Sequence, residues 1–513
     1  MCPPAIKWLF PQGDRGHSFS VPTPMMKHPL RGFFLAAALL ACGLRADVSL
    51  PRIFGDNLVL QREAPVPVWG QAAPGEAVTV RFAGQERPTH ADAGGRWQVV
   101  LEKLKASATP RTLTVSAANV VELHNILVGE VWLCSGQSNM EYATDVAKPW
   151  APATTATDPA VGAEVRTRTF PTLRLFRVEK IRQPPEVVSS GWQAAGGDAR
   201  AQFSAVGYLF GRHLLDELGL PVGLIQAAWG GSRIEEWIPA EAYAALAGVF
   251  AGGGEASLER DPAMLGRNYE SMVRPLAPYA LRGVIWYQGE SNLIAYNDGL
   301  RYADKFRVFV DAWRAAWRAP ALPFYCVQIA PFRYTGRKDP LAHSPEELPR
   351  LWEAQLAALA LPQTGLVPTT DLVDDLDNIH PTHKREVAER LAALALSRTY
   401  GRRGLAWAGP SFARFEVRGL EAVVHFNPAG SGLASRDGKP LTDFEIAGAD
   451  GRWMPAQAVI RGDTVVVSSR DGSVPAAARF GWSEAARPNL VDRAGLPVWP
   501  FRSNGPAWKP SVP

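Results

Sequence analysis

Cysteine and clustered charge are both scarce in this sequence. The chain of 513 residues has four cysteines, and only Cys134 and Cys326 lie beyond the first 46 residues. Two cysteines are too few for a disulfide framework, and both lie in apolar, strand-like runs, so we expect two buried free thiols. The formal net charge is +4 and there is no long basic run, which argues against a nucleic-acid-binding protein.

Long hydrophobic runs are also missing. The apolar stretch at residues 33–41 is too short to cross a bilayer, but it has the length of a signal-peptide core and follows Lys27 and Arg31. We therefore assign residues 1–46 as a signal segment of a secreted or periplasmic protein. The alternative is a lipoprotein-type cleavage that leaves a lipid anchor on Cys42.

Hydrophobic residues make up 47% of the chain, which is enough for several packed cores. Residues 47–125 contain short alternating strands separated by Gly, Pro and Asp, the pattern of a β-sandwich-like domain. Residues 126–402 alternate apolar strands with helical periodicity, which predicts a parallel sheet covered by helices on both faces. Residues 403–513 again indicate a β-rich domain.

Specific elements can be placed within the central region. The apolar runs 222–228 and 324–329 are typical of buried strands. Apolar residues recur at three and four positions over 206–218 and 306–317, as on one face of a helix. A last helix is expected from about Lys384 to Arg398.

The first candidate for chemistry is Ser138, in the polar segment 135–140. This segment follows the apolar run 131–134, which places it at the carboxyl end of a strand, where open α/β sheets bind ligands. A serine at a strand-to-helix turn can expose its hydroxyl as a nucleophile and its backbone N–H to an oxyanion. A polar turn that caps a helix is the alternative interpretation.

The second candidate is His380, which follows Asp377 by three residues. A serine nucleophile needs a base, and the base needs an orienting group; Asp377 is the first choice and Asp375 the reserve. An acidic loop with a surface histidine is the alternative. Acidic and histidine residues over 371–383 also raise the hypothesis of a metal site, but their spacing matches neither a calcium loop nor a zinc helix. We therefore predict no metal and no cofactor.

Two further polar segments also follow strand-like runs. Gly230 and Gly231 are paired glycines, which let a backbone N–H approach a ligand closely. Gln288 and Asn292 carry amide donors that can stabilise an oxyanion, and Glu290 between them is expected to order the loop. Each segment taken alone could be an ordinary turn.

Together these segments supply a nucleophile, oxyanion donors and a base, and their residues resemble the SGNH hydrolase superfamily. The resemblance is most specific to the sialate O-acetylesterase family and related carbohydrate acetylesterases. The similar blocks are residues 136–140, 230–235, 286–292 and 379–384. The similarity extends over nearly all of the chain from about residue 48 to 505.

The resemblance implies a flavodoxin-like SGNH core flanked by N-terminal and C-terminal β-rich domains. It also implies that Ser138 attacks an acetyl carbonyl and that His380 takes the serine proton. The backbone N–H groups of Ser138 and Gly231, with an amide from Asn292 or Gln288, would hold the oxyanion. The loop before His380 looks about one residue longer than the usual family form, so its orienting group could also be a backbone carbonyl.

The expected substrate is an O-acetylated sugar, with O-acetylated sialic acid preferred. Acetylated xylan or another plant glycan is the alternative, because these blocks determine acyl chemistry and not the choice of sugar. A catalytically dead carbohydrate-binding protein would lack Ser138 or His380, and both are present. A lipid-directed esterase or thioesterase on the same fold is a further alternative.

Overall fold

The structure is a computed structural model, and the predicted signal segment with Cys42 lies outside the residues that it describes. Described are residues 47–505, apart from 149–151, 183–185, 245, 247–263, 297, 338–342 and 429. Among these residues, no helix has the length and apolar character needed to cross a membrane.

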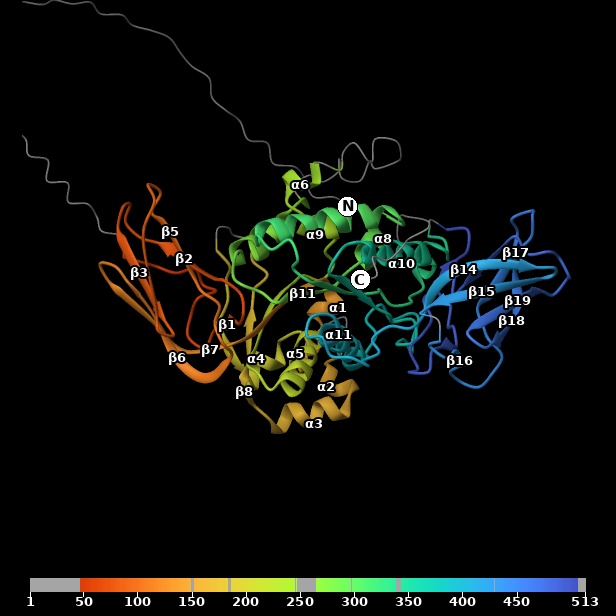
Figure 1. Ribbon diagram of the computed structural model, residues 1–513, viewed down its shortest axis with the longest axis horizontal. Coiled ribbons are helices and arrows are strands. Elements are labelled where there is room, and N and C mark those ends of the chain that lie inside the picture. Colours follow the sequence, from red (N-terminus) through yellow and green to blue (C-terminus); the bar gives the residue numbers. More distant parts are fainter. Residues whose placement is uncertain are drawn as a thin grey trace, which may run out of the picture. The chain divides into compact units, whose positions relative to one another are not determined.

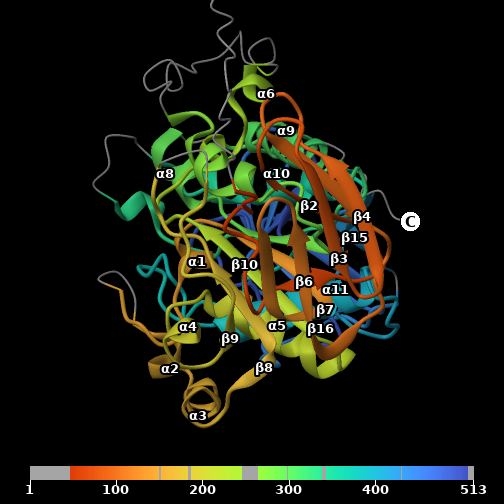
Figure 2. The ribbon, with the colours of Figure 1, turned by 90° about the vertical axis from the view of Figure 1, so that its left-hand side faces the viewer.

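The N-terminal region is built from antiparallel strands, as the alternating sequence predicts, together with one short strand, Val59–Gln61, that pairs in parallel. Figure 2 shows these strands facing the viewer. They are β1 (Val59–Gln61), β2 (Val66–Gln71), β3 (Ala77–Phe82), β4 (Gln85–His90), β5 (Arg96–Leu101), β6 (Ser107–Ser116) and the first half of β7 (Val120–Gly136). β2 pairs with β5, while β3 pairs with β4 and β6. β3 and β5 bury every second side chain, because one face of these strands packs on the core.

Strand β7 belongs to two environments. Its first half pairs antiparallel with β6 and alternates exposed with buried side chains, whereas every residue from Ile126 to Gly136 is buried. Its second half pairs in parallel with β10 and β11. The predicted domain boundary at residues 125 and 126 therefore coincides with a change in packing inside one continuous strand and not with a linker.

The central sheet carries the site. Its strand order is β13-β12-β11-β7-β10-β8-β9, and all neighbours are parallel except β8 and β9. After β7 the chain first adds strands on one side of it and then on the other, so the carboxyl end of β7 is a topological switch point. The remaining central strands are β8 (Phe170–Arg177), β9 (Gln193–Ala195), β10 (Val222–Ala228), β11 (Gly283–Tyr287), β12 (Phe324–Val327) and β13 (Thr364–Val367).

Helices cover both faces of this sheet, as predicted. Figure 1 shows α9 and α10 on one side of the strands and α5 and α11 on the other. The helices are α1 (Ser138–Glu141), α2 (Thr154–Thr157), α3 (Pro159–Thr167), α4 (Gly197–Ala201), α5 (Ala205–Leu218), α6 (Ala240–Ala244), α8 (Glu290–Tyr296), α9 (Arg301–Ala316), α10 (Glu347–Ala357) and α11 (Lys384–Arg398). The bounds of α11 are those expected from the sequence.

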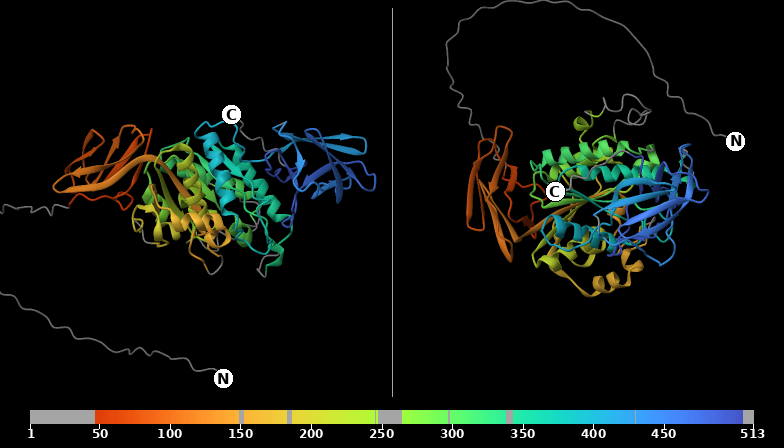
Figure 3. Two further views of the ribbon diagram at one scale, coloured as in Figure 1. Left: turned by 90° about the horizontal axis from the view of Figure 1, so that it is seen from below. Right: turned by 45° about the vertical axis from the view of Figure 1, so that its right-hand side comes forward.

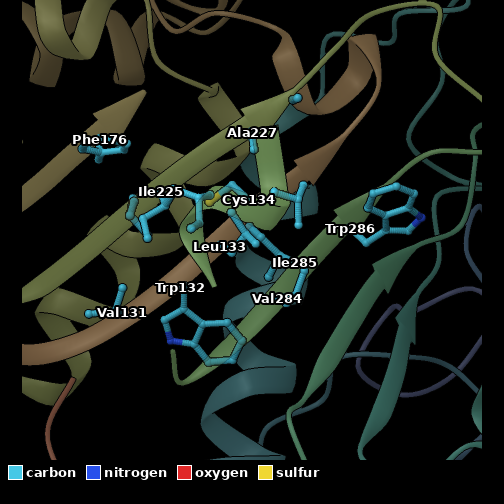
Figure 4. Close-up of a cluster of buried hydrophobic side chains, with 14 of the residues drawn as sticks. Val131, Trp132, Leu133, Cys134, Phe176, Ile225, Ala227, Val284, Ile285 and Trp286 are labelled. Carbon is cyan, nitrogen blue, oxygen red and sulfur yellow. The ribbon is translucent and has the colours of Figure 1, made fainter. Parts of the chain in front are cut away.

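Apolar side chains from β7, β10 and β11 form the centre of the core, as Figure 4 shows. Cys134 and Cys326 are both buried free thiols, as predicted. Burial raises the pKa of each thiol above its ordinary value, so neither cysteine is a candidate nucleophile.

The C-terminal region is a second set of antiparallel strands, drawn blue in Figure 3. They are β14 (Ser411–Arg418), β15 (Glu421–Asn427), β16 (Ala434–Ser435), β17 (Phe444–Ala447), β18 (Trp453–Arg461), β19 (Thr464–Ser469), β20 (Ala477–Phe480), β21 (Leu490–Val491) and β22 (Phe501–Arg502). This region packs around an apolar cluster of its own, whereas the N-terminal strands share the large cluster of the central sheet.

Candidate active site

Ser138 lies directly beyond the carboxyl end of β7, at the first position of helix α1. Its Oγ is 2.8 Å from Nε2 of His380, a residue 242 positions later in the sequence. Ser138 is 8% exposed and His380 is half-buried, so the pair lies at the surface end of the sheet. The structure thus brings together the two residues that sequence reasoning selected, within hydrogen-bond distance of each other.

His380 lies in an irregular loop that precedes α11. Its backbone N–H donates to Oδ1 of Asn378 at 2.9 Å. Both carboxylate oxygens of Asp377 accept hydrogen bonds from Nη1 of Arg333, at 2.9 and 2.7 Å, and Asp377 is exposed. Oδ1 of Asp375 accepts from the backbone N–H of Asp377. That Asp377 or Asp375 orients the imidazole of His380 therefore stays a prediction.

The acidic residues around this loop contact separate partners. Asp371 pairs with Arg390, and Asp374 lies 2.8 Å from Nε2 of His383. Within the described part of the chain, no three His, Cys, Asp or Glu side chains gather closely enough to hold a metal ion. The hypothesis of a metal site at residues 371–383 thus gains no support from the positions of these donors.

The glycine turn after β10 packs against the nucleophile. A Cβ placed on Gly230 would be 3.3 Å from Cβ of Ser138, so a larger residue would push the turn away. Gly231 has φ +77°, a backbone conformation that favours glycine. Glu141 fixes the turn, because its Oε2 accepts from the backbone N–H of Gly230 at 2.6 Å. Among the described residues, none accepts a hydrogen bond from the backbone N–H of Ser138 or Gly231.

The two candidate amides lie inside the molecule behind these backbone donors. Nδ2 of Asn292 donates to Oε2 of Glu235 at 2.8 Å and to Oδ2 of Asp298 at 2.7 Å, which uses both of its hydrogens. Nε2 of Gln288 has three acceptors within 3.2 Å, on Gln137, Ser232 and Asn292. Both residues are fully buried. The hydrogens of both amides are therefore used in hydrogen bonds within the protein, to residues that include Gln137 before Ser138 and Ser232 after the glycine turn. Neither amide has a hydrogen left for an oxyanion.

Comparison with known proteins assigns the chain to a family. The family described as "Carbohydrate esterase, sialic acid-specific acetylesterase" matches residues 128–397, which is more than half of the chain. The protein belongs to this family. The resemblance noted from the sequence blocks is confirmed, and with it the prediction of a carboxylic ester hydrolase.

The similarity extends beyond the central sheet. Human sialate O-acetylesterase is 28% identical over 477 residues, which cover 83% of this chain and 86% of the human protein. The mouse sialate O-acetylesterase is 28% identical over 470 residues, covering 78% and 83%. The crystal structure of a carbohydrate acetylesterase from Xanthomonas citri is 36% identical, has a TM-score of 0.77, and covers 89% of this chain and 100% of its own.

Sequence reasoning missed the structural role of Asn139 in this esterase. Nδ2 of Asn139 donates to Oε1 of Glu290 at 2.6 Å and to the backbone carbonyl of Ile379 at 3.1 Å. Its Oδ1 accepts from Nζ of Lys384 at 2.6 Å. Asn139 is therefore the residue where three of the sequence blocks meet. Its place beside Ser138 was visible in the sequence, but its partners lie 151 to 245 positions away.

Two buried charged groups flank Asn139. Burial lowers the pKa of Lys384 to about 7, and burial raises the pKa of Glu290 above its ordinary value. Nζ of Lys384 also lies 4.6 Å from the ring centroid of Tyr142 and 5.6 Å from that of Tyr287. Glu290 is thereby linked to the nucleophile segment through Asn139.

Proposed function

We propose that this protein is a serine esterase that removes O-acetyl groups from a carbohydrate through an acetyl-serine intermediate. The observation that supports the mechanism most directly is the 2.8 Å distance between Oγ of Ser138 and Nε2 of His380. Membership of a carbohydrate esterase family supports the choice of substrate class. A dead carbohydrate-binding protein would have no reason to keep this pair in hydrogen-bond geometry.

The proposed reaction has two halves. Oγ of Ser138 attacks the acetyl carbonyl while Nε2 of His380 takes the serine proton. The backbone N–H groups of Ser138 and Gly231 stabilise the negative charge on the carbonyl oxygen. His380 then gives its proton to the leaving sugar oxygen. Water, deprotonated by the same nitrogen, attacks the acetyl-serine; His380 then returns the proton to Oγ of Ser138, and acetate and free Ser138 result. We keep Asp377, with Asp375 in reserve, as the proposed orienting residue.

O-acetylated sialic acid is our preferred substrate. The family description and the mammalian relatives both refer to sialic acid esters. The site also has a cation suited to an acidic sugar: the guanidinium of Arg182 lies 4.1 Å from the ring centroid of Trp229, next to Gly230. Arg182 is exposed to solvent. Acetylated xylan or another neutral glycan remains the second candidate.

The remaining predictions stay part of the proposal. We propose a flavodoxin-like SGNH core at residues 126–402 with flanking β-rich domains at 47–125 and 403–513. The support is a parallel sheet whose switch point carries Ser138. We also propose export to the periplasm or outside the cell, directed by residues 1–46, with lipid anchoring at Cys42 as the alternative.

Acetate release tests the proposal. We expect Ser138→Ala to lower turnover of an aryl acetate by several orders of magnitude, because nucleophile and base act as a unit. The same assay on 9-O-acetylated sialic acid and on acetylated xylan decides the sugar. Ser138→Ala with wild-type turnover would reject the mechanism, and equal activity on both sugars would reject sialic acid specificity.

A further inference from the structure

Asn139 joins the two halves of the proposed catalytic pair. It follows Ser138 in helix α1, and its Nδ2 donates to the carbonyl of Ile379, the residue before His380. One side-chain amide thereby ties the nucleophile block to the histidine loop. The orientation of that amide therefore decides whether this connection exists, since a flipped amide would place its oxygen against the carbonyl of Ile379.

Charged groups set the orientation of the Asn139 amide. Nζ of Lys384 carries donor hydrogens whether or not it is protonated, and it donates to Oδ1 of Asn139 at 2.6 Å. On the other side, Oε1 of Glu290 accepts from Nδ2 at 2.6 Å. Lys384 is 1% exposed and Glu290 is 1% exposed, so water does not compete for these contacts.

Burying the side chains of Lys384 and Glu290 lowers the stability of the folded protein. Burying a charge without a direct ionic partner costs free energy. Nζ of Lys384 donates to a neutral amide, and the charge of Glu290 favours its protonated form without a direct ion pair among the described residues. Oε2 of Glu290 has no hydrogen-bond partner there. Stability alone would favour apolar residues at both positions, which points to a role in the site.

We propose that Lys384 and Glu290 are positioning residues that hold the Asn139 amide in the orientation that fixes His380 against Ser138. Neither residue contacts the reacting atoms. They act through Asn139 and the carbonyl of Ile379, so their removal is expected to change the geometry of the catalytic pair and not the binding of substrate. The inference rests on the proposed role of Ser138 and His380.

Lys384→Met tests this role, because methionine keeps much of the side-chain length but has no donor. We expect kcat for an aryl acetate to fall roughly 100-fold with KM unchanged, the size expected when a reacting group is misplaced by about 1 Å. The rate at which a fluorophosphonate labels Ser138 should fall in parallel. A general loss of stability would lower the folded fraction and would not change the labelling rate of the molecules that remain folded.

Two further variants control the experiment. Arg282→Met removes one partner of buried Glu130, which lies eight residues before Ser138 and roughly 26 Å away along β7. This variant should lose thermal stability but keep its kcat. The double variant Lys384→Met/Glu290→Gln leaves no buried unpaired charge, so it should melt close to the wild type while its kcat stays low.

The outcomes separate this inference from the proposed function. Wild-type kcat and labelling rate in folded Lys384→Met, or in the double variant where the single one does not fold, would overturn the inference. If Ser138→Ala is inactive in the same assay, the esterase mechanism still stands. If Ser138→Ala retains turnover, the proposed function fails first and the inference with it.

Discussion

Two lysines are buried in the part of this esterase that the structure describes, and one has direct acidic partners whereas the other has none. Lys305 lies 2.8 Å from a carboxylate oxygen of Glu235 and 2.8 Å from one of Asp298. Lys384 contacts a neutral amide and two aromatic rings. Burial opposes the charge of Lys305, but Asp298 and Glu235 outweigh it and hold its pKa above the ordinary value. Burial lowers the pKa of Lys384 to about 7, and the charge of Glu290 offsets only part of that effect.

We infer that the cluster around Lys305 supports the fold, whereas the cluster around Lys384 positions the proposed catalytic pair. The Lys305 cluster also holds Asn292, whose Nδ2 bonds Glu235 and Asp298, and so it supports the loops below the glycine turn. Its cation has two direct carboxylate partners, so removing the cation would leave buried carboxylates unpaired. The Lys384 cluster lies beside the proposed catalytic pair, and its buried cation has no direct ionic partner, as is common at functional sites.

The largest effect on folding should come from Lys305→Met. It leaves two carboxylates buried near each other without their cation, and we expect a loss of about 3–5 kcal/mol in the free energy of unfolding. Urea denaturation of the variant and the wild type at pH 7 gives this difference. Lys384→Met should cost clearly less, because Lys384 has no direct ionic partner to lose. Equal losses in the two variants would contradict the comparison.

A smaller effect should appear in the pH dependence of stability. Between pH 7 and about 10, the unfolded chain keeps a proton on Lys384 that the folded protein has lost, so stability should rise with pH. Lys384→Met should lack this contribution.

His383 affects the pH dependence of stability with the opposite sign. Glu386 and Asp374 raise its pKa to about 9, and its contribution to stability is lost as pH rises through that value. His383 is present in both proteins, so it cancels when their free energies of unfolding are compared at pH 7 and pH 9. If the free energies of unfolding of the wild type and Lys384→Met change equally between pH 7 and pH 9, the pKa of Lys384 is not lowered, and the prediction is contradicted.

Much of this molecule is predictable from sequence because its signals are local. Helices α5 and α9 follow from periodicity, and the position of Ser138 follows from an apolar strand that runs into a polar turn. The continuity of β7 across residues 125 and 126 could not be predicted, because the strand changes its pairing partners without a break in the chain. The commitment of Asn292 to two carboxylates could not be predicted either, because it depends on long-range packing around Lys305.

The account depends most on Ser138 as the nucleophile. Incubation of the wild-type protein with a fluorophosphonate, followed by peptide mass spectrometry, identifies the serine that forms the covalent adduct. We predict one adduct, on Ser138, formed at a rate that His380→Ala lowers by orders of magnitude. An adduct on another residue, or labelling of Ser138 that is unchanged in His380→Ala, would contradict the account.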